Sequence, residues 1–180
     1  WDPSYTDESW IKDRVELIPR LQRLIAENYP GRGVMIGEYN FGAEQHVSSG
    51  LAVAEALGRF AQGGVQAAFY WTYPPDRSPA FWAFRAYRNF DGAGAHFLER
   101  SLPTAAPEGT SLFASRDERG AHVVAIALNF RPDRALYPTL GLTGCGAVTQ
   151  QAVFQYTGEP GGFVPVTPPS GSGPPMPALP

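Results

Sequence analysis

One carboxylate stands where a short apolar run meets a polar, aromatic loop. Residues 34–36 (VMI) lead into residues 37–42 (GEYNFG), which contain Glu38. In a barrel of alternating strands and helices, side chains at the carboxyl ends of the strands form the catalytic rim. A Glu in that position can attack the anomeric carbon of a sugar. Tyr39 can donate a hydrogen bond that orients Glu38, and it is a candidate substrate contact. The alternative is that Glu38 is only a solvated charge at the end of a strand.

Two further side chains can contact a sugar. Trp71 ends a second apolar run, residues 65–71 (VQAAFYW), and its indole can stack on the apolar face of a pyranose ring. Packing in the core is the alternative for Trp71. His46, in the loop that follows Glu38, can bind sugar hydroxyls. Glu44 and His46 alone do not define a metal site, because other ligands are lacking nearby, so no metal ligand is predicted.

Three helical patterns position these residues by alternating with the two apolar runs. The first pattern begins at Pro19 and stops at Pro30-Gly31, the second follows Ser48 or Ser49 and stops at Gly63-Gly64, and the third begins at Ser78-Pro79. This alternation predicts an α/β unit with parallel strands. A parallel sheet of two strands cannot cover its own faces and edges, so we expect the unit to be incomplete.

The second half of the chain has a different pattern. A hairpin is predicted where residues 111–115 and 122–129 flank an Asp-Glu-Arg-Gly turn. Further strands are expected over 135–142 and 147–156. We therefore divide the chain into an α/β part at 1–97, an antiparallel β part at 98–166 and a Pro/Gly/Ser-rich tail at 167–180.

Composition excludes several classes of protein. The 180 residues carry 14 Lys and Arg against 17 Asp and Glu, without the basic stripe that nucleic acid or an anionic membrane surface requires. The single Cys rules out an intrachain disulfide framework. No apolar run is long enough to span a bilayer. The chain begins with Trp rather than Met, and we expect it to be a piece of something larger.

Five segments in order resemble one family. They are WDPSYTDESWI, IPRLQRLIAENYPG, IGEYNFGAEQH, the Gly-Gly-Val strand that ends in YWT, and PAFWAFRAYRNFDG. Together they resemble the C-terminal part of the catalytic module of glycoside hydrolase family 44, from Trp1 to about Phe97. The resemblance implies the last two β/α units of a TIM-like (β/α)8 barrel, followed by an antiparallel β-sandwich portion. It also implies a retaining, endo-acting hydrolase of β-1,4-glucans such as cellulose, carboxymethyl cellulose and xyloglucan.

The same resemblance assigns roles and shows one departure. It makes Glu38 of the EYN motif the nucleophile and places Trp71 beside the sugar at the point of cleavage. The acid/base of the family is the Glu of an Asn-Glu-Pro motif, which this chain lacks, because Glu159-Pro160 follows Gly158. We therefore expect the acid/base and the rest of the barrel upstream, and no turnover by the chain alone. The family also implies a secreted protein that needs no cofactor for its chemistry; members commonly bind structural calcium, for which no ligands are assigned.

Two other hypotheses remain open at this point. The chain can belong to a non-catalytic carbohydrate-binding module on the same scaffold, or to another retaining barrel glycosidase, such as a mannanase or a β-galactosidase. A binding module would bind oligosaccharides without hydrolysis and without dependence on Glu38. Calorimetry with cello- and xyloglucan-oligosaccharides on the natural chain and a Glu38 variant separates binding from catalysis.

Overall fold

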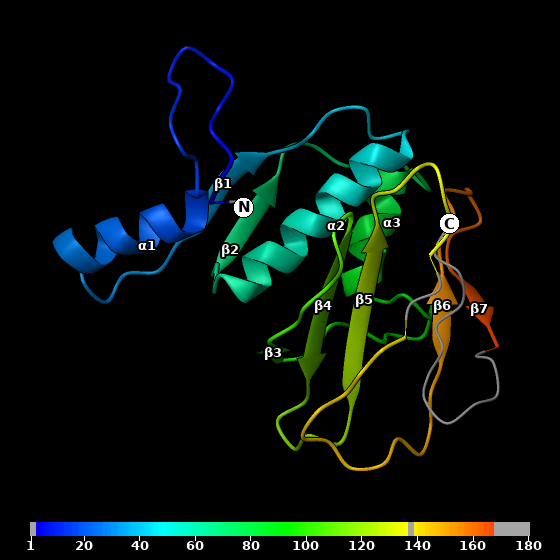
Figure 1. Ribbon diagram of the computed structural model, residues 1–180. Coiled ribbons are helices and arrows are strands. Elements are labelled where there is room, and N and C mark those ends of the chain that lie inside the picture. Colours follow the sequence, from blue (N-terminus) through cyan, green and yellow to red (C-terminus); the bar gives the residue numbers. More distant parts are fainter. Residues whose placement is uncertain (1–2, 137–138, 168–180) are drawn as a thin grey trace. The chain divides into compact units, whose positions relative to one another are not determined.

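The computed structural model describes residues 3–136 and 139–167 (Figure 1). Contacts between residues divide the chain into two compact units. One unit comprises Trp1–Asn40 and Ala56–Tyr73, and the other comprises Phe41–Glu55 and Pro74–Pro180. The division groups residues 74–97 with the strands that follow them, and the boundary we placed at residue 97 stays a prediction. Most of the predicted tail, residues 168–180, lies outside the described residues.

The first unit contains a parallel pair of strands, helix α1 (Leu17–Asn28) and the part of helix α2 (Val47–Gln62) from Ala56 onward. Helix α1 precedes strand β1 (Met35–Tyr39), and helix α2 leads to strand β2 (Ala67–Tyr70). Strands β1 and β2 pair in parallel, as their arrows in Figure 1 show. This confirms the predicted alternation of helices and strands. Helix α1 begins two residues before Pro19, which is tolerated in the first turn because the N–H groups there have no partner within the helix.

Apolar side chains from both helices form the core of this unit. Ile18 of α1 and Ala56 and Phe60 of α2 are buried together. Four partly buried residues from β1, β2 and the turn between α2 and β2 pack against this cluster: Ile36, Tyr39, Val65 and Ala68. One face of the parallel pair is therefore covered by helices.

The end of α2 is set by a glycine, as its sequence predicts. Gly64 has φ +62°, a left-handed conformation that costs little without a Cβ. The N–H of Val65 donates to the carbonyl of Phe60 at 2.9 Å, and the N–H of Gly64 donates to that of Ala61 at 3.2 Å. These two bonds make a Schellman motif, which satisfies carbonyls that the helix leaves open.

The second unit contains helix α3 and two antiparallel sheets. Helix α3 (Pro79–Tyr87) begins where predicted, because the buried Ser78 hydroxyl accepts a hydrogen bond from the Phe81 N–H at 3.1 Å. One sheet has the order β3-β4-β5 and the other pairs β6 with β7. Their bounds are Arg100–Leu102, Thr110–Arg116, Val123–Asn129, Val153–Gln155 and Val164–Val166.

The predicted hairpin is confirmed, and two predicted strands are corrected. Strands β4 and β5 pair over seven residues each, and Gly120 closes their turn with φ +71°. The described part of residues 135–142 forms no named strand, and only 153–155 of the predicted 147–156 does so. Glycines at 141, 144 and 146 leave little side chain to pack there, which weakens strand formation.

Helix α3 packs against the β6–β7 hairpin through one indole. The ring of Trp82 lies 6.3 Å from that of Tyr156 and 6.2 Å from that of Phe163, measured between centroids. Gly162, with φ +83°, presents its bare Cα to the same indole, so a Cβ there would overlap the ring. The close approach of helix and hairpin therefore depends on a residue without a side chain.

Acidic pH is expected to weaken the β4–β5 hairpin. The Asp117 carboxylate accepts hydrogen bonds from the His122 ring at 2.8 Å and from the Ala121 N–H at 2.8 Å. These bonds, that of His122 first, hold the pKa of Asp117 below its ordinary value of 3.8. A pKa lower in the folded state gives stability that is present above pH 3.8 and is lost as the pH falls through the folded-state pKa.

Asp117→Asn should therefore lower the free energy of unfolding at pH 7 and reduce its fall on acidification. Urea unfolding between pH 7 and pH 2 measures both effects, with Asp76→Asn, an exposed loop carboxylate, as the control. If the free energy of unfolding fell equally on acidification in Asp117→Asn and in the natural protein, the bonds of Asp117 would not contribute to stability.

No helix among the described residues has the length and apolar character needed to cross a bilayer.

Candidate active site

Glu38 lies at the carboxyl end of β1 and is exposed. Its partner across the parallel pair is Phe69, whereas Ile36 pairs with Ala68. Ala68 and Phe69 are adjacent in β2, but their partners Ile36 and Glu38 are two residues apart in β1. The register therefore shifts at Gly37. This is a β-bulge with Gly37 as the extra residue.

The bulge places Glu38 on the face that the helices leave open. Ile36 and Ala68 pack against the helices, so their register neighbours Glu38 and Phe69 lie on the opposite face. That face also carries Met35, and both apolar side chains are more than half exposed, at 59% for Met35 and 55% for Phe69. An exposed carboxylate therefore stands at the end of an uncovered apolar sheet face.

Trp71 extends this face at the end of β2. Its N–H donates to the Tyr39 carbonyl at 2.8 Å, which continues the ladder one residue past β2. Because Trp71 is two residues beyond Phe69, its side chain falls on the same face as Glu38. The indole is 53% exposed, and Thr72 follows with φ +68°. A β-branched residue in this conformation is a backbone outlier of the kind found at functional sites.

Tyr39 lies on the other face. Its ring meets those of Phe60 and Tyr70 edge-on, at centroid distances of 5.3 Å and 5.2 Å. Burial, together with the nearby Tyr70 hydroxyl, raises the pKa of Tyr39 to about 12. The geometry thus differs from our expectation that Tyr39 orients Glu38, because adjacent residues of a strand point to opposite faces. The substrate contact predicted for Tyr39 stays a prediction that this packing does not support.

His46 lies at the start of α2. Its Nδ1 lies 3.2 Å from the Ser48 N–H, which donates to it, and 2.8 Å from the Ser48 hydroxyl. The ring thus serves as the helix cap, although the sequence suggested Ser48 or Ser49 for that role. The contact of His46 with substrate stays a prediction. A histidine cap is hard to foresee, because serine dominates such positions statistically.

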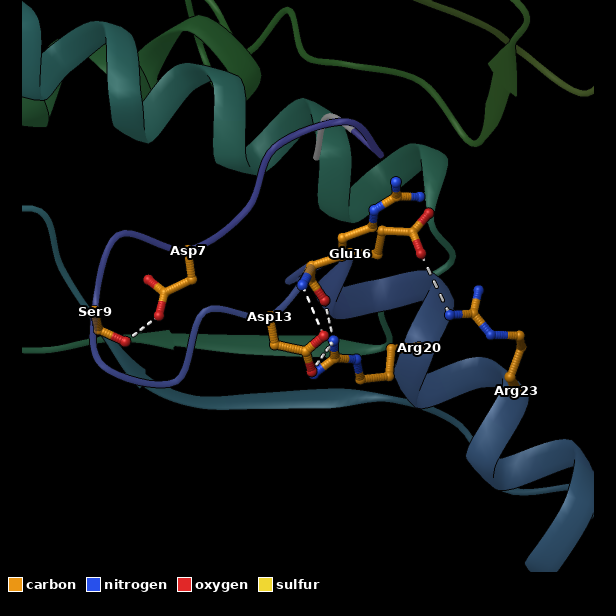
Figure 2. Close-up of polar contacts among 7 residues, drawn as sticks. Asp7, Ser9, Asp13, Glu16, Arg20 and Arg23 are labelled. Atoms are coloured by element: carbon orange, nitrogen blue, oxygen red, sulfur yellow. Dashed lines mark hydrogen bonds and ion pairs between the residues drawn. The ribbon is translucent and has the colours of Figure 1, made fainter.

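The loop before α1 carries an indole that our sequence reasoning did not single out. Trp10 is 90% exposed within a loop that a bridge between Thr6 and Arg14 closes. Figure 2 shows how helix α1 anchors this loop: Arg20 pairs with Asp13 at 2.8 Å. The signal was a tryptophan amid charged residues, where burial in a core is improbable.

A second ion pair and a turn contact complete this anchor. Arg23 pairs with Glu16 at 3.4 Å, and the Ser9 hydroxyl donates to the Asp7 carboxylate (Figure 2). The four charges of the two ion pairs are all at least partly exposed to solvent, with 26% the lowest side-chain exposure, at Glu16, so each pair contributes on the order of 1 kcal/mol or less. The anchor therefore favours one loop conformation without fixing it rigidly.

Within residues 3–136 and 139–167, no three His, Cys, Asp or Glu side chains lie close enough together to hold a metal ion. What this face offers chemically is one accessible carboxylate and one accessible indole.

Comparisons with known proteins place this arrangement in a class. No family model matches the chain. Endoglucanase A of Paenibacillus lautus is 36% identical to it over 168 residues, which are 88% of this chain and 24% of that protein. The crystal structure of CelM2, a bifunctional glucanase-xylanase from a metagenome library, superposes with a TM-score of 0.92 and 32% identity, over 100% of this chain and 35% of CelM2.

A third likeness specifies the family. A Paenibacillus polymyxa xyloglucanase of glycoside hydrolase family 44, solved with xyloglucan, superposes with a TM-score of 0.81 and 25% identity, over 93% of this chain and 34% of the xyloglucanase. The fold is thus that of part of a glycoside hydrolase structure. The chain belongs to glycoside hydrolase family 44. It spans about a third of the solved proteins and about a quarter of the curated relative that it matches.

Proposed function

We propose that this chain is the nucleophile-bearing segment of a retaining, endo-acting hydrolase of β-1,4-glucans. The observation that carries the proposal is the position of Glu38, exposed at the carboxyl end of a parallel strand on the same sheet face as Trp71. Glucanase and xyloglucanase names among its relatives support the substrate class. The substrate partner is a β-glucan chain.

The chemistry assigned to Glu38 follows from its charge and its exposure. Its carboxylate attacks the anomeric carbon and forms an ester bond while the bond to the leaving oxygen breaks. The leaving oxygen takes a proton from an acid outside this chain, because the Asn-Glu-Pro motif is missing here. The conjugate base then removes a proton from water, which releases the sugar with its original configuration.

The same proposal assigns the fold in finer terms. Strands β1 and β2 with their helices are the last two β/α units of a TIM-like (β/α)8 barrel, and strands β3 to β7 are part of a β-sandwich. The uncovered side chains of Met35 and Phe69 support this assignment, because the interior of such a barrel is filled by apolar side chains from all its strands. The remaining strands come from the rest of a longer, secreted protein.

The stereochemistry of hydrolysis tests the proposed function. In the full-length protein, proton NMR during cleavage of cello-oligosaccharides should show the β-anomer first, followed by slow mutarotation. Carboxymethyl cellulose and xyloglucan should be cleaved internally, whereas the 180-residue chain alone should release no reducing sugar. Initial formation of the α-anomer, or binding of oligosaccharides without cleavage by the full-length protein, would overturn the proposal.

Trp71→Ala should lower kcat/KM on cello-oligosaccharides by about 10- to 100-fold, because a buried aromatic contact often contributes 2 kcal/mol or more to binding. Trp71→Phe should keep part of the activity that Trp71→Ala loses. Tyr73, which is 93% exposed two residues later, is the matched control, and its replacement by Ala should change kcat/KM little. Equal kcat/KM values for Trp71→Ala and the natural enzyme would remove Trp71 from the site.

A further inference from the structure

The bulge in β1 changes which face Glu38 occupies. In an unbroken strand, residues two apart share a face, so Glu38 would lie with Ile36 against the helices. There it would meet the buried cluster of Ile18, Ala56 and Phe60. Because Gly37 is left out of the pairing, Glu38 takes the next position of the ladder, opposite Phe69. The bulge thus converts a helix-facing position into one on the open face.

Bulges are rare in parallel pairs, and they occur preferentially beside active sites, where they redirect a side chain. This one falls immediately before Glu38. The remainder of the pairing is regular, since Met35 and Ile36 pair before it and Glu38 and Tyr39 pair after it. The irregularity is therefore confined to the single residue that sets the direction of the carboxylate.

Position 37 of the bulge has room for a larger residue than glycine. No heavy atom among the described residues lies within 4 Å of a Cβ built on Gly37, and its φ is outside the left-handed region. A methyl group at this position is therefore compatible with the bulge. A β-branched side chain is less so, because it favours the regular extended backbone.

We propose that the Gly37 bulge aims the Glu38 carboxylate at the reacting carbon, which makes Gly37 a positioning residue of the reaction. The inference rests on the proposed function, since it assumes that Glu38 is the nucleophile. Deletion of Gly37 removes the extra residue itself, so Ile36 should still pair with Ala68 and Glu38 with Phe69, the partners they have now, and Glu38 should stay on the open face. The deletion should remove only the local bend and twist of the strand, and with them the exact direction of the Glu38 carboxylate.

The test is a set of variants in the full-length enzyme. Deletion of Gly37 should lower kcat by about 100-fold, the scale expected for a misplacement of about 1 Å, with KM changed less than about threefold. Its melting temperature should stay within a few degrees of the natural value. Gly37→Ala restores the residue count and should restore kcat to within about threefold. A purely structural role would instead lower the melting temperature and leave the kcat of the folded enzyme unchanged.

Further variants separate the possible failures. If the deletion variant does not fold, Gly37→Val replaces it and should have a kcat at least tenfold below that of Gly37→Ala. A kcat near the natural value in the deletion variant, or equal values for the Val and Ala variants, would overturn the inference about Gly37. Glu38→Gln, measured alongside, reports on the proposed function itself: an inactive Glu38→Gln with a fully active deletion variant removes only the role of the bulge.

Discussion

Glu38→Gln in the full-length enzyme should lower kcat on cello-oligosaccharides by about 10⁴-fold or more, the scale of loss seen when a catalytic nucleophile is removed. An amide has nearly the shape of a carboxylate but cannot form the ester intermediate. Because Glu38 is exposed at a strand end, the substitution should leave the melting temperature unchanged. Glu27→Gln, on the exposed side of α1, is the matched control and should retain full activity.

Chemical rescue distinguishes a lost nucleophile from a damaged site. Glu38→Gly leaves space for azide, which can attack the anomeric carbon while the leaving oxygen takes its proton from the acid/base. With an activated glucoside, azide should restore turnover and give the α-glycosyl azide. Natural activity in Glu38→Gln would remove Glu38 from the mechanism, and rescue that yields only the β-azide would assign it another role.

Gly162→Ala should lower the free energy of unfolding by about 3 kcal/mol. Two costs add at this position: a left-handed conformation costs a residue with a Cβ about 1–2 kcal/mol, and forcing a methyl group into a packed site costs about 1–3 kcal/mol. Gly162 has φ +83°, and its added Cβ would overlap the Trp82 indole. Urea unfolding monitored by tryptophan fluorescence measures the loss.

The neighbouring glycine supplies a matched control. Gly161 has neither a left-handed φ nor any heavy atom of the described residues within 4 Å of an added Cβ, so Gly161→Ala should change stability by less than about 0.5 kcal/mol. Combining Gly162→Ala with Trp82→Ala should give less than the sum of the two losses, because the overlap disappears with the indole. Full additivity would show that the indole and Gly162 do not interact.

Local chemistry made several element ends predictable. The glycine pair after α2 and the Ser-Pro pair before α3 predicted boundaries that the structure confirms, because both act through bonds to adjacent backbone groups. The hairpin between β4 and β5 was predictable for the same reason. Strand formation over 135–142 was not, because pairing depends on partners that are distant in the sequence.

The candidate site, too, was predictable only in part. Glu38 and Trp71 were identifiable as strand-end residues, and the structure places both on one face of the sheet. The opposite orientation of Tyr39 follows from strand alternation once β1 is known. The bulge at Gly37 was not predictable, because Met-Ile-Gly-Glu-Tyr reads equally well as an unbroken strand, in which Glu38 would face the helices.

Trapping of the glycosyl-enzyme intermediate tests the central claim most directly. A 2-deoxy-2-fluoro cellobioside with a good leaving group slows both steps of a retaining reaction, so the ester should accumulate on the full-length enzyme. Peptide mass spectrometry should then find a single fluorinated cellobiosyl group on Glu38, and none in the Glu38→Gln variant. Labelling of another carboxylate, or turnover that inverts configuration without any label, would contradict the account.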